Sequence, residues 1–187
     1  MSRAITSRSR VPERLVWAAA QIDLKPKAKL LEIGSGGGQL LALLAAQSPS
    51  ARLTGIDRSR SKVESAQSRF EGAQGTRRIH VQHQTLIEAA THVEHPYDVV
   101  VAVNVNAFWV DPVKALPALR RLVDPRGCVY LIFEPPSTAA LRRVQAELSH
   151  LLAEYGFRVP TVRTTKFAGT HGVCLETVPQ RRPRLAQ

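Results

Sequence analysis

Cysteines and long hydrophobic runs are scarce in this chain of 187 residues. No apolar stretch approaches the roughly 20 residues of a membrane-spanning helix, and residues 1–10 lack the hydrophobic segment of a secretory signal. The two cysteines, Cys128 and Cys174, lie in apolar, strand-like runs, which indicates small buried side chains in a reducing compartment. We therefore expect a soluble, cytoplasmic protein with no membrane partner and no catalytic cysteine.

Internal repeats, low-complexity segments and linkers are also absent from the central part of the chain. The content of 44% hydrophobic residues suffices for one sizeable core. The net charge of +11 suggests a nucleic-acid partner, but six of the basic residues lie at the two ends: Arg3, Arg8, Arg10, Arg181, Arg182 and Arg184. We expect one domain over residues 12–178 between flexible basic tails at 1–11 and 179–187, and we favour a small-molecule partner over nucleic acid.

A metal-ligand set is missing as well. The histidines of the middle region are His80, His83, His92 and His95. Two of them, His80 and His83, fall on opposite faces of a predicted strand, and no cysteine or acidic ligand set joins them. The sequence therefore predicts no metal site.

A glycine-rich segment follows the first predicted strand, residues 28–33, and leads into a predicted helix over 38–47. Glycine permits a positive φ and lets a ligand approach the backbone, and the helix start offers N–H groups. A dinucleotide fingerprint starting at Gly34 requires glycine or alanine at position 39, where this chain has Gln39. The segment thus indicates a nucleotide-like cofactor but argues against a nicotinamide dehydrogenase.

The second predicted strand, residues 52–57, ends at Asp57. A carboxylate at this position can accept hydrogen bonds from both hydroxyls of a ribose. The structural alternative is that Asp57 caps the polar helix predicted near 59–70. Both interpretations place Asp57 at the same edge of the sheet as the glycine segment.

The remaining pattern alternates strands and helices. Helices are predicted over 12–22, 112–122 and 138–155. Gly72 and Gly75 lead from the helix near 59–70 to a strand over 78–83, and a short helix or loop over 86–95 follows that strand. Parallel strands are predicted over 78–83, 97–104 and 127–133, and a terminal hairpin over 157–167 and 173–178. This rhythm is typical of an α/β fold with one open sheet.

The spacing Glu32-x-Gly34-x-Gly36-x-Gly38, with Asp57 ending the next strand, resembles motif I of class I S-adenosylmethionine-dependent methyltransferases. The resemblance covers about residues 12–178. It implies a Rossmann-like three-layer sandwich with a seven-stranded, mostly parallel sheet and an antiparallel C-terminal hairpin. It also implies S-adenosylmethionine as cofactor and S-adenosylhomocysteine as product.

By this resemblance the cofactor-binding residues follow from their place in the chain. The loop residues Gly34, Ser35, Gly36 and Gly38 hold the methionine part, and Glu32 organises its ammonium group; the alternative for Glu32 is a partner of the helix dipole. The remaining candidates are Asp57 for the ribose, Arg58, Gln84 and Thr85 for the adenine, and the Asn104 backbone carbonyl for the ammonium. An Asp that binds adenine in many relatives is replaced here by the stretch His83-Gln84-Thr85.

The resemblance also places Asn106, Phe108 and Trp109 against the substrate, after the strand over 97–104. The alternative is that Phe108 and Trp109 anchor the following helix. The sequence does not assign a catalytic base. Glu134 and His171 are both candidates, and the catalytic residue is left unassigned. The Asn/Asp-Pro-Pro-aromatic motif of nucleobase amino methylation is absent after this strand.

These features predict a methyltransferase that acts on an O, N or C atom of a small molecule. RNA or another macromolecule is the alternative substrate, because the chain is basic and has little insertion to cover its cleft. A catalytically inactive protein that binds cofactor or a partner is a further alternative. The sequence leaves monomer and homodimer open.

Overall fold

The computed structural model describes residues 11–71 and 78–180. Most of the two predicted basic tails, and the connection through Gly72 and Gly75, therefore lie outside the described residues. The first elements are α1 (Glu13–Gln21), β1 (Lys29–Ile33), α2 (Gln39–Gln47), β2 (Arg52–Asp57), α3 (Arg60–Phe70) and β3 (Ile79–His83). They agree with the predicted βαβ rhythm to within one residue at most ends.

The second half continues with α4 (Leu86–His92), β4 (Tyr97–Val103), α5 (Ala107–Val110), α6 (Pro112–Leu122), β5 (Val123–Phe133), α7 (Thr138–Glu154), β6 (Thr161–Lys166) and β7 (His171–Thr177). The seven strands form one sheet in the order β3-β2-β1-β4-β5-β7-β6. Strands β1 to β5 pair in parallel, and β7 is antiparallel to both β5 and β6. The predicted seven-stranded Rossmann-like sheet with an antiparallel hairpin is confirmed.

Three strand starts differ from the prediction by two or more residues. The strand predicted over 157–167 begins only at Thr161, because Pro160 has no N–H to give to a ladder, although Phe157 forms an isolated bridge with Pro179. Its partner starts earlier than predicted, at His171, which pairs with Lys166. Strand β5 begins at Val123 rather than 127, and its register with β4 shifts between Tyr97 and Val99.

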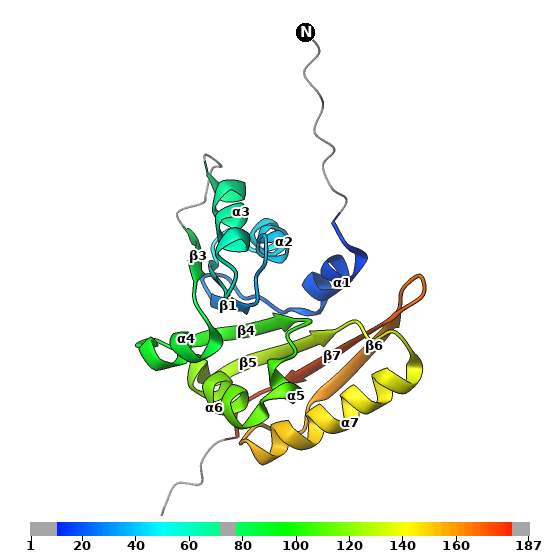
Figure 1. Ribbon diagram of the computed structural model, residues 1–187. Coiled ribbons are helices and arrows are strands. Elements are labelled where there is room, and N and C mark those ends of the chain that lie inside the picture. The colour runs from blue at the N-terminus through cyan, green and yellow to red at the C-terminus, as the bar shows by residue number, and fades with distance from the viewer. Residues whose placement is uncertain (1–10, 72–77, 181–187) are drawn as a thin grey trace, which may run out of the picture.

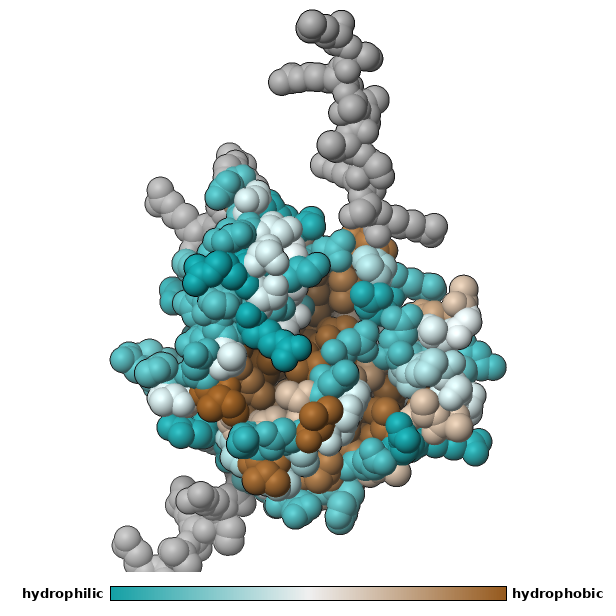
Figure 2. Space-filling view, viewed as in Figure 1, coloured by the Kyte–Doolittle hydropathy of each residue, from teal (hydrophilic) through white to brown (hydrophobic). Residues whose placement is uncertain are grey.

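Helices cover both faces of the sheet (Figure 1). α1, α2 and α3 lie on one face, and α4, α5, α6 and α7 lie on the other. None of the helices in the described ranges combines the length and the apolar character that a bilayer crossing requires. On the side shown in Figure 2, polar residues cover the outer helices, and apolar surface gathers in a central hollow.

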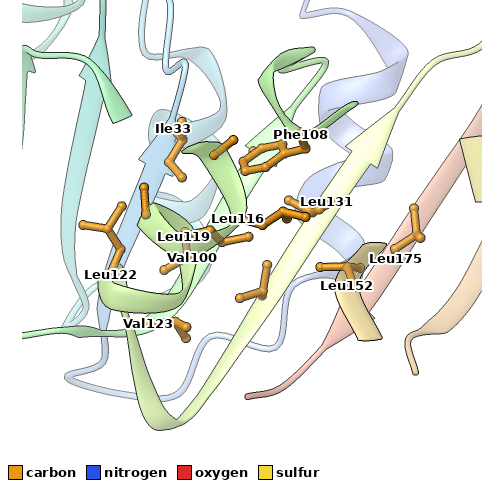
Figure 3. Close-up of a cluster of buried hydrophobic side chains, with 14 of the residues drawn as sticks. Ile33, Val100, Phe108, Leu116, Leu119, Leu122, Val123, Leu131, Leu152 and Leu175 are labelled. Carbon is orange, nitrogen blue, oxygen red and sulfur yellow. The ribbon is translucent and has the colours of Figure 1, made fainter. Parts of the chain in front are cut away.

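The core is divided by the central strand β4, whose apolar side chains alternate between the two faces. Val99 and Val101 pack with α1, α2 and α3, whereas Val100 and Ala102 pack with the helices of the second half. Figure 3 shows the second cluster, in which α6 and α7 place leucines over the sheet. Burial on both faces is the reason that β4 is apolar and almost entirely β-branched from Val99 to Val103.

Candidate functional site

The glycine loop that joins β1 to α2 is fixed by the neighbouring strand β2. The backbone N–H groups of Gly34 and Ser35 both donate to the carbonyl oxygen of Ile56, at 2.8 and 3.0 Å. A Cβ added at Gly34 would come within 2.8 Å of a methyl carbon of Val105, which follows β4. The loop therefore lies between the carboxyl ends of β2 and β4, the usual ligand edge of an open α/β sheet.

Gly36 is the residue of the loop that leaves space for a ligand. It has a φ of +51°, and a Cβ added to it would meet no atom within 4 Å. Its N–H donates to Asp57 Oδ2 over 2.9 Å, while Asp57 Oδ1 accepts from the backbone N–H of Ser59 over 2.8 Å. Each carboxylate oxygen keeps a further lone pair for a ligand. Ser59 rather than Asp57 is the N-cap residue of α3, so the capping alternative for Asp57 does not describe this structure.

Glu32 places a second carboxyl group beneath the same loop. Its side chain is 3% exposed, and Oε2 has no hydrogen-bond partner within the described residues. Burial raises the pKa of Glu32 well above its ordinary range, and the negative charge of Asp57 adds to the increase. A hydrogen bond from the Leu41 backbone acts in the opposite direction. A positively charged ligand at this place would satisfy the orphaned oxygen and favour the ionised carboxylate.

Ser35 and Gly38 hold the loop in position through packing. Ser35 is buried against Gly55 of β2, where an added Cβ would lie 2.7 Å from Ser35 Oγ. Gly38, with a φ of +72°, lies against α3, where an added Cβ would approach the ring of Phe70 within 2.8 Å. The structure thus gives Gly38 a packing reason that is independent of any ligand.

The three residues predicted for an adenine ring have different surroundings. Arg58 is exposed after β2, and its carbonyl oxygen lies 3.1 Å from His83 Nε2. Thr85 is the N-cap of α4: its hydroxyl accepts from the Glu88 N–H, and the Glu88 side chain accepts from the Thr85 backbone N–H. Gln84 is half-buried and donates its backbone N–H to the carbonyl of Asp57. Of the three, Gln84 is tied most directly to the loop.

Asn104 connects the loop side of the site to a neighbouring pocket. It follows β4 with a φ of +55°, and its side-chain Oδ1 accepts from the Glu134 backbone N–H over 2.8 Å. The carboxyl ends of β4 and β5 are thereby joined. The next residue, Val105, lies against Gly34, so the segment that lines the pocket also contacts the glycine loop.

The pocket has a volume of about 370 Å³. It is lined by the segment after β4, the end of β5 and one side of α7, namely Asn104, Asn106, Trp109, Phe133, Glu134, Pro135, Pro136, Ala140, Arg143, Val144 and Glu147. The rings of Trp109 and Phe133 lie 4.4 Å apart at 49°. Of the predicted substrate residues, Asn106 and Trp109 line the pocket. Phe108 is fully buried and belongs to the core shown in Figure 3, which is the anchoring role that the sequence left open.

The methyltransferase domain family matches residues 31–129, which is more than half of the chain. The chain belongs to the methyltransferase domain family. The matched range holds the glycine loop, Asp57 and the segment after β4.

Individual relatives extend the comparison. The ubiquinone biosynthesis O-methyltransferase of Leptothrix cholodnii is 31% identical over 140 residues, which are 73% of this chain and 57% of that protein. The magnesium protoporphyrin IX methyltransferase of Synechocystis PCC 6803, solved with bound S-adenosylmethionine, superposes with a TM-score of 0.66 at 23% identity and covers 89% of this chain and 76% of its own. The mitomycin 7-O-methyltransferase structure has a TM-score of 0.70 at 19% identity, over 89% of this chain and 53% of its own. This methyltransferase domain thus spans just over half of the first relative.

Several pocket residues of the domain were not predicted. Phe133 ends β5 and reads as a core residue, and Arg143 and Val144 belong to a helix whose apolar spacing indicates only a packed face. The short helix α5, which carries Trp109, was also missed. Four residues are too few to produce a helical period in the sequence.

Proposed function

We propose that this protein is an S-adenosylmethionine-dependent methyltransferase that acts on a small-molecule acceptor. The observation that carries the proposal is the buried Glu32 carboxyl, whose Oε2 lacks a partner, beneath a loop that leaves open space at Gly36. Family membership independently supports the reaction class.

The charges of the site favour this cofactor over a dinucleotide. Glu32 and Asp57 interact closely enough for each charge to oppose the other. A pyrophosphate placed at this loop would add further negative charge, whereas the ammonium and sulfonium groups of S-adenosylmethionine are both cationic. Attraction between opposite charges in a partly dehydrated site offsets the cost of burying Glu32.

The proposed contacts follow the arrangement of the loop. Gly34, Ser35 and Gly36 would line the methionine part, with Glu32 and the Asn104 carbonyl toward its ammonium group. Asp57 would accept hydrogen bonds from the two ribose hydroxyls while it retains the hydrogen bond from the Gly36 N–H. For the adenine we propose contacts with Gln84 and Arg58. We do not propose a contact with Thr85, because its side chain caps α4.

Catalysis at this site would rest on positioning. The bound cofactor supplies a methyl group on a positively charged sulfur, which is already an activated leaving group. Asn104 lines the pocket and the next residue, Val105, lies against Gly34 of the loop, so this segment would set how the acceptor faces the cofactor. Trp109 and Phe133 exclude water from one side of the acceptor. Alignment of this kind can account for a large part of a displacement's rate.

A pocket of about 370 Å³ suits a small molecule. The relatives described above are named after ubiquinone biosynthesis, mitomycin and magnesium protoporphyrin IX, which supports a small-molecule acceptor here. The basic charge gives weaker support for RNA. Seven of the 26 lysines and arginines lie outside the described ranges, which leaves 19 basic against 15 acidic residues within them.

The decisive experiment is calorimetric titration of the protein with S-adenosylmethionine, S-adenosylhomocysteine and NADH. We expect the first two to bind, NADH not to bind, and Asp57→Ala to weaken the binding at least about tenfold through the loss of two charge-assisted hydrogen bonds. Asp23→Ala is the matched control, because Asp23 is exposed and its carboxylate pairs with Lys25. NADH binding, or no binding of either adenosyl compound, would contradict the proposal.

A second readout separates an enzyme from an inactive binding protein. Binding of S-adenosylmethionine without its consumption across a broad acceptor panel would indicate the inactive alternative. A salt-sensitive interaction with RNA, which falls steeply between low and physiological ionic strength, would instead favour the macromolecular substrate.

A further inference from the structure

The pocket beside the glycine loop has an apolar wall and a polar inner end. Trp109 and Phe133 form a tilted aromatic pair, and Val144 and Ala140 of α7 extend the wall. Aromatic faces pack most favourably against flat, apolar groups. The wall therefore fits one face of a planar ring.

Glu134 supplies the carboxylate at the inner end. Its side chain is 23% exposed, Oε1 accepts from the Thr170 hydroxyl over 2.8 Å, and Oε2 lies 3.4 Å from Arg14 Nη1. Its backbone N–H donates to Asn104. Contacts from α1 and from the β6–β7 turn thus fix the carboxylate, and Asn104 fixes the backbone of the same residue. The remaining lone pairs of the carboxylate can accept a hydrogen bond from a ligand.

The charged residues at the outer rim provide little attraction for an anionic ligand. Arg143 and Glu147 face each other along α7 at 3.9 Å, and their side chains are 74% and 54% exposed. An exposed pair of this kind is screened by water and has little net effect. Arg14 balances the charge of Glu134 at the inner end, but the Glu134 carboxylate offers only acceptor oxygens, so a hydroxyl group can donate a hydrogen bond to it and a ligand carboxylate cannot.

On the basis of the methyltransferase function proposed above, we propose that the pocket takes a planar aromatic ring bearing a hydroxyl group, and that Glu134 accepts the hydroxyl proton during transfer. The O–H bond of the acceptor breaks and its proton moves to the Glu134 carboxylate. The oxygen lone pair forms the new bond to the methyl carbon, and the electron pair of the broken carbon–sulfur bond remains on sulfur as a thioether. Glu134 is then a catalytic residue, and Arg14 and Thr170 are positioning residues.

Binding by the full chain is tested with three matched probes followed by fluorine NMR: para-fluorophenol, its methyl ether para-fluoroanisole, and para-fluorobenzoate. We expect the phenol to bind about tenfold more tightly than the ether, because the ether cannot donate a hydrogen bond to the charged carboxylate. Glu134→Ala should reduce this preference to less than about threefold, and Trp109→Ala should weaken both probes. Equal binding of phenol and ether, or tighter binding of the benzoate, would overturn the proposal.

Proton transfer is tested with Glu134→Gln, which keeps the shape of the side chain. We expect formation of the methyl ether to fall about 100-fold or more while the affinity for para-fluorophenol changes less than about tenfold. Glu154→Gln, on the exposed end of α7, is the control. A wild-type rate in Glu134→Gln would overturn the catalytic role, as would a wild-type protein that binds the phenol and S-adenosylmethionine but forms no ether.

Two further measurements separate the possible failures. Thr170→Val keeps the Glu134 carboxylate but removes the hydrogen bond that the Thr170 hydroxyl donates to it. We expect a smaller loss of rate, about threefold to tenfold, with the preference for the phenol retained. An unchanged rate would contradict the positioning role. Calorimetry with S-adenosylhomocysteine tests the cofactor site independently: binding of that compound without phenol preference would refute the acceptor assignment and leave the methyltransferase proposal intact.

Discussion

Gly36 donates its backbone N–H to the Asp57 carboxylate across 2.9 Å and so ties the glycine loop to the end of β2. The two residues are 21 positions apart in the chain. One interaction thus fixes the open part of the loop and orients a carboxylate toward the same space. Loop geometry and ligand recognition are therefore coupled through this hydrogen bond.

Gly55→Ala tests the packing behind the loop. The added Cβ would lie 2.7 Å from Leu41 Cδ1 and 2.7 Å from Ser35 Oγ. We expect a loss of about 1 to 3 kcal/mol in the free energy of unfolding, measured in urea, because buried atoms must shift. Gly37→Ala is the control: its Cβ would make an ordinary contact of 3.6 Å with Ser65, and stability should change by less than about 0.5 kcal/mol.

Thr85→Ala should act on stability rather than on ligand affinity. The substitution removes the capping box of α4, and we expect it to lower the free energy of unfolding by about 1 kcal/mol. Thr91→Ala, in the same helix, removes only a hydroxyl that donates to the Ile87 carbonyl. A drop in affinity for S-adenosylhomocysteine without loss of stability would instead support the adenine contact predicted for Thr85.

Glu32 should make the stability of the ligand-free protein depend on pH. Its raised pKa, caused first by burial and then by Asp57, means that the folded protein retains a proton that the unfolded chain has released. The free energy of unfolding therefore falls as pH rises from the ordinary Glu range toward the raised pKa. Glu32→Gln should flatten this decline in urea titrations at a series of pH values above the ordinary Glu range, whereas Glu154→Gln should not. An identical slope in both variants would contradict the role of Glu32.

Both thiols should be unreactive in the folded protein. Burial raises the pKa of Cys128 to about 11 and that of Cys174 to about 12. Since the thiolate is the reactive form, a thiol reagent at neutral pH should label neither residue in the native state and both in denaturant. Rapid labelling of native Cys128 would show that its strand opens readily.

The parts of the fold that depend on local burial and backbone conformation could be predicted from the sequence. The β-branched run of β4 and the glycine spacing before α2 are imposed by burial and by backbone conformation, so both could be read directly. Phe108 was ambiguous, because an aromatic residue after a strand can face either a ligand or the core, and only the packing of α6 against the sheet places it inside.

The contacts of the Glu134 side chain could not be predicted from the sequence. Its partner Arg14 is 120 positions away and Thr170 is 36 positions away, and no local pattern marks such a pairing. The same holds for Arg143, which reaches the pocket only because α7 packs beside the end of β5. Helical spacing predicts the buried side of α7 but not which polar residue borders a cavity.

The anchoring of α1 has a consequence for the order of folding. Gln21 accepts from Arg163 of β6, 142 positions later, and Arg14 meets Glu134 after β5. These are among the longest loop closures in the chain, and contacts of such separation form late because of their entropic cost. During synthesis α1 emerges before the sheet and can pack on α2 early, but its contacts with Glu134 and Arg163 form only after β5 and the C-terminal hairpin have emerged. The five parallel strands can assemble before then, while the Glu134 end of the pocket is completed last.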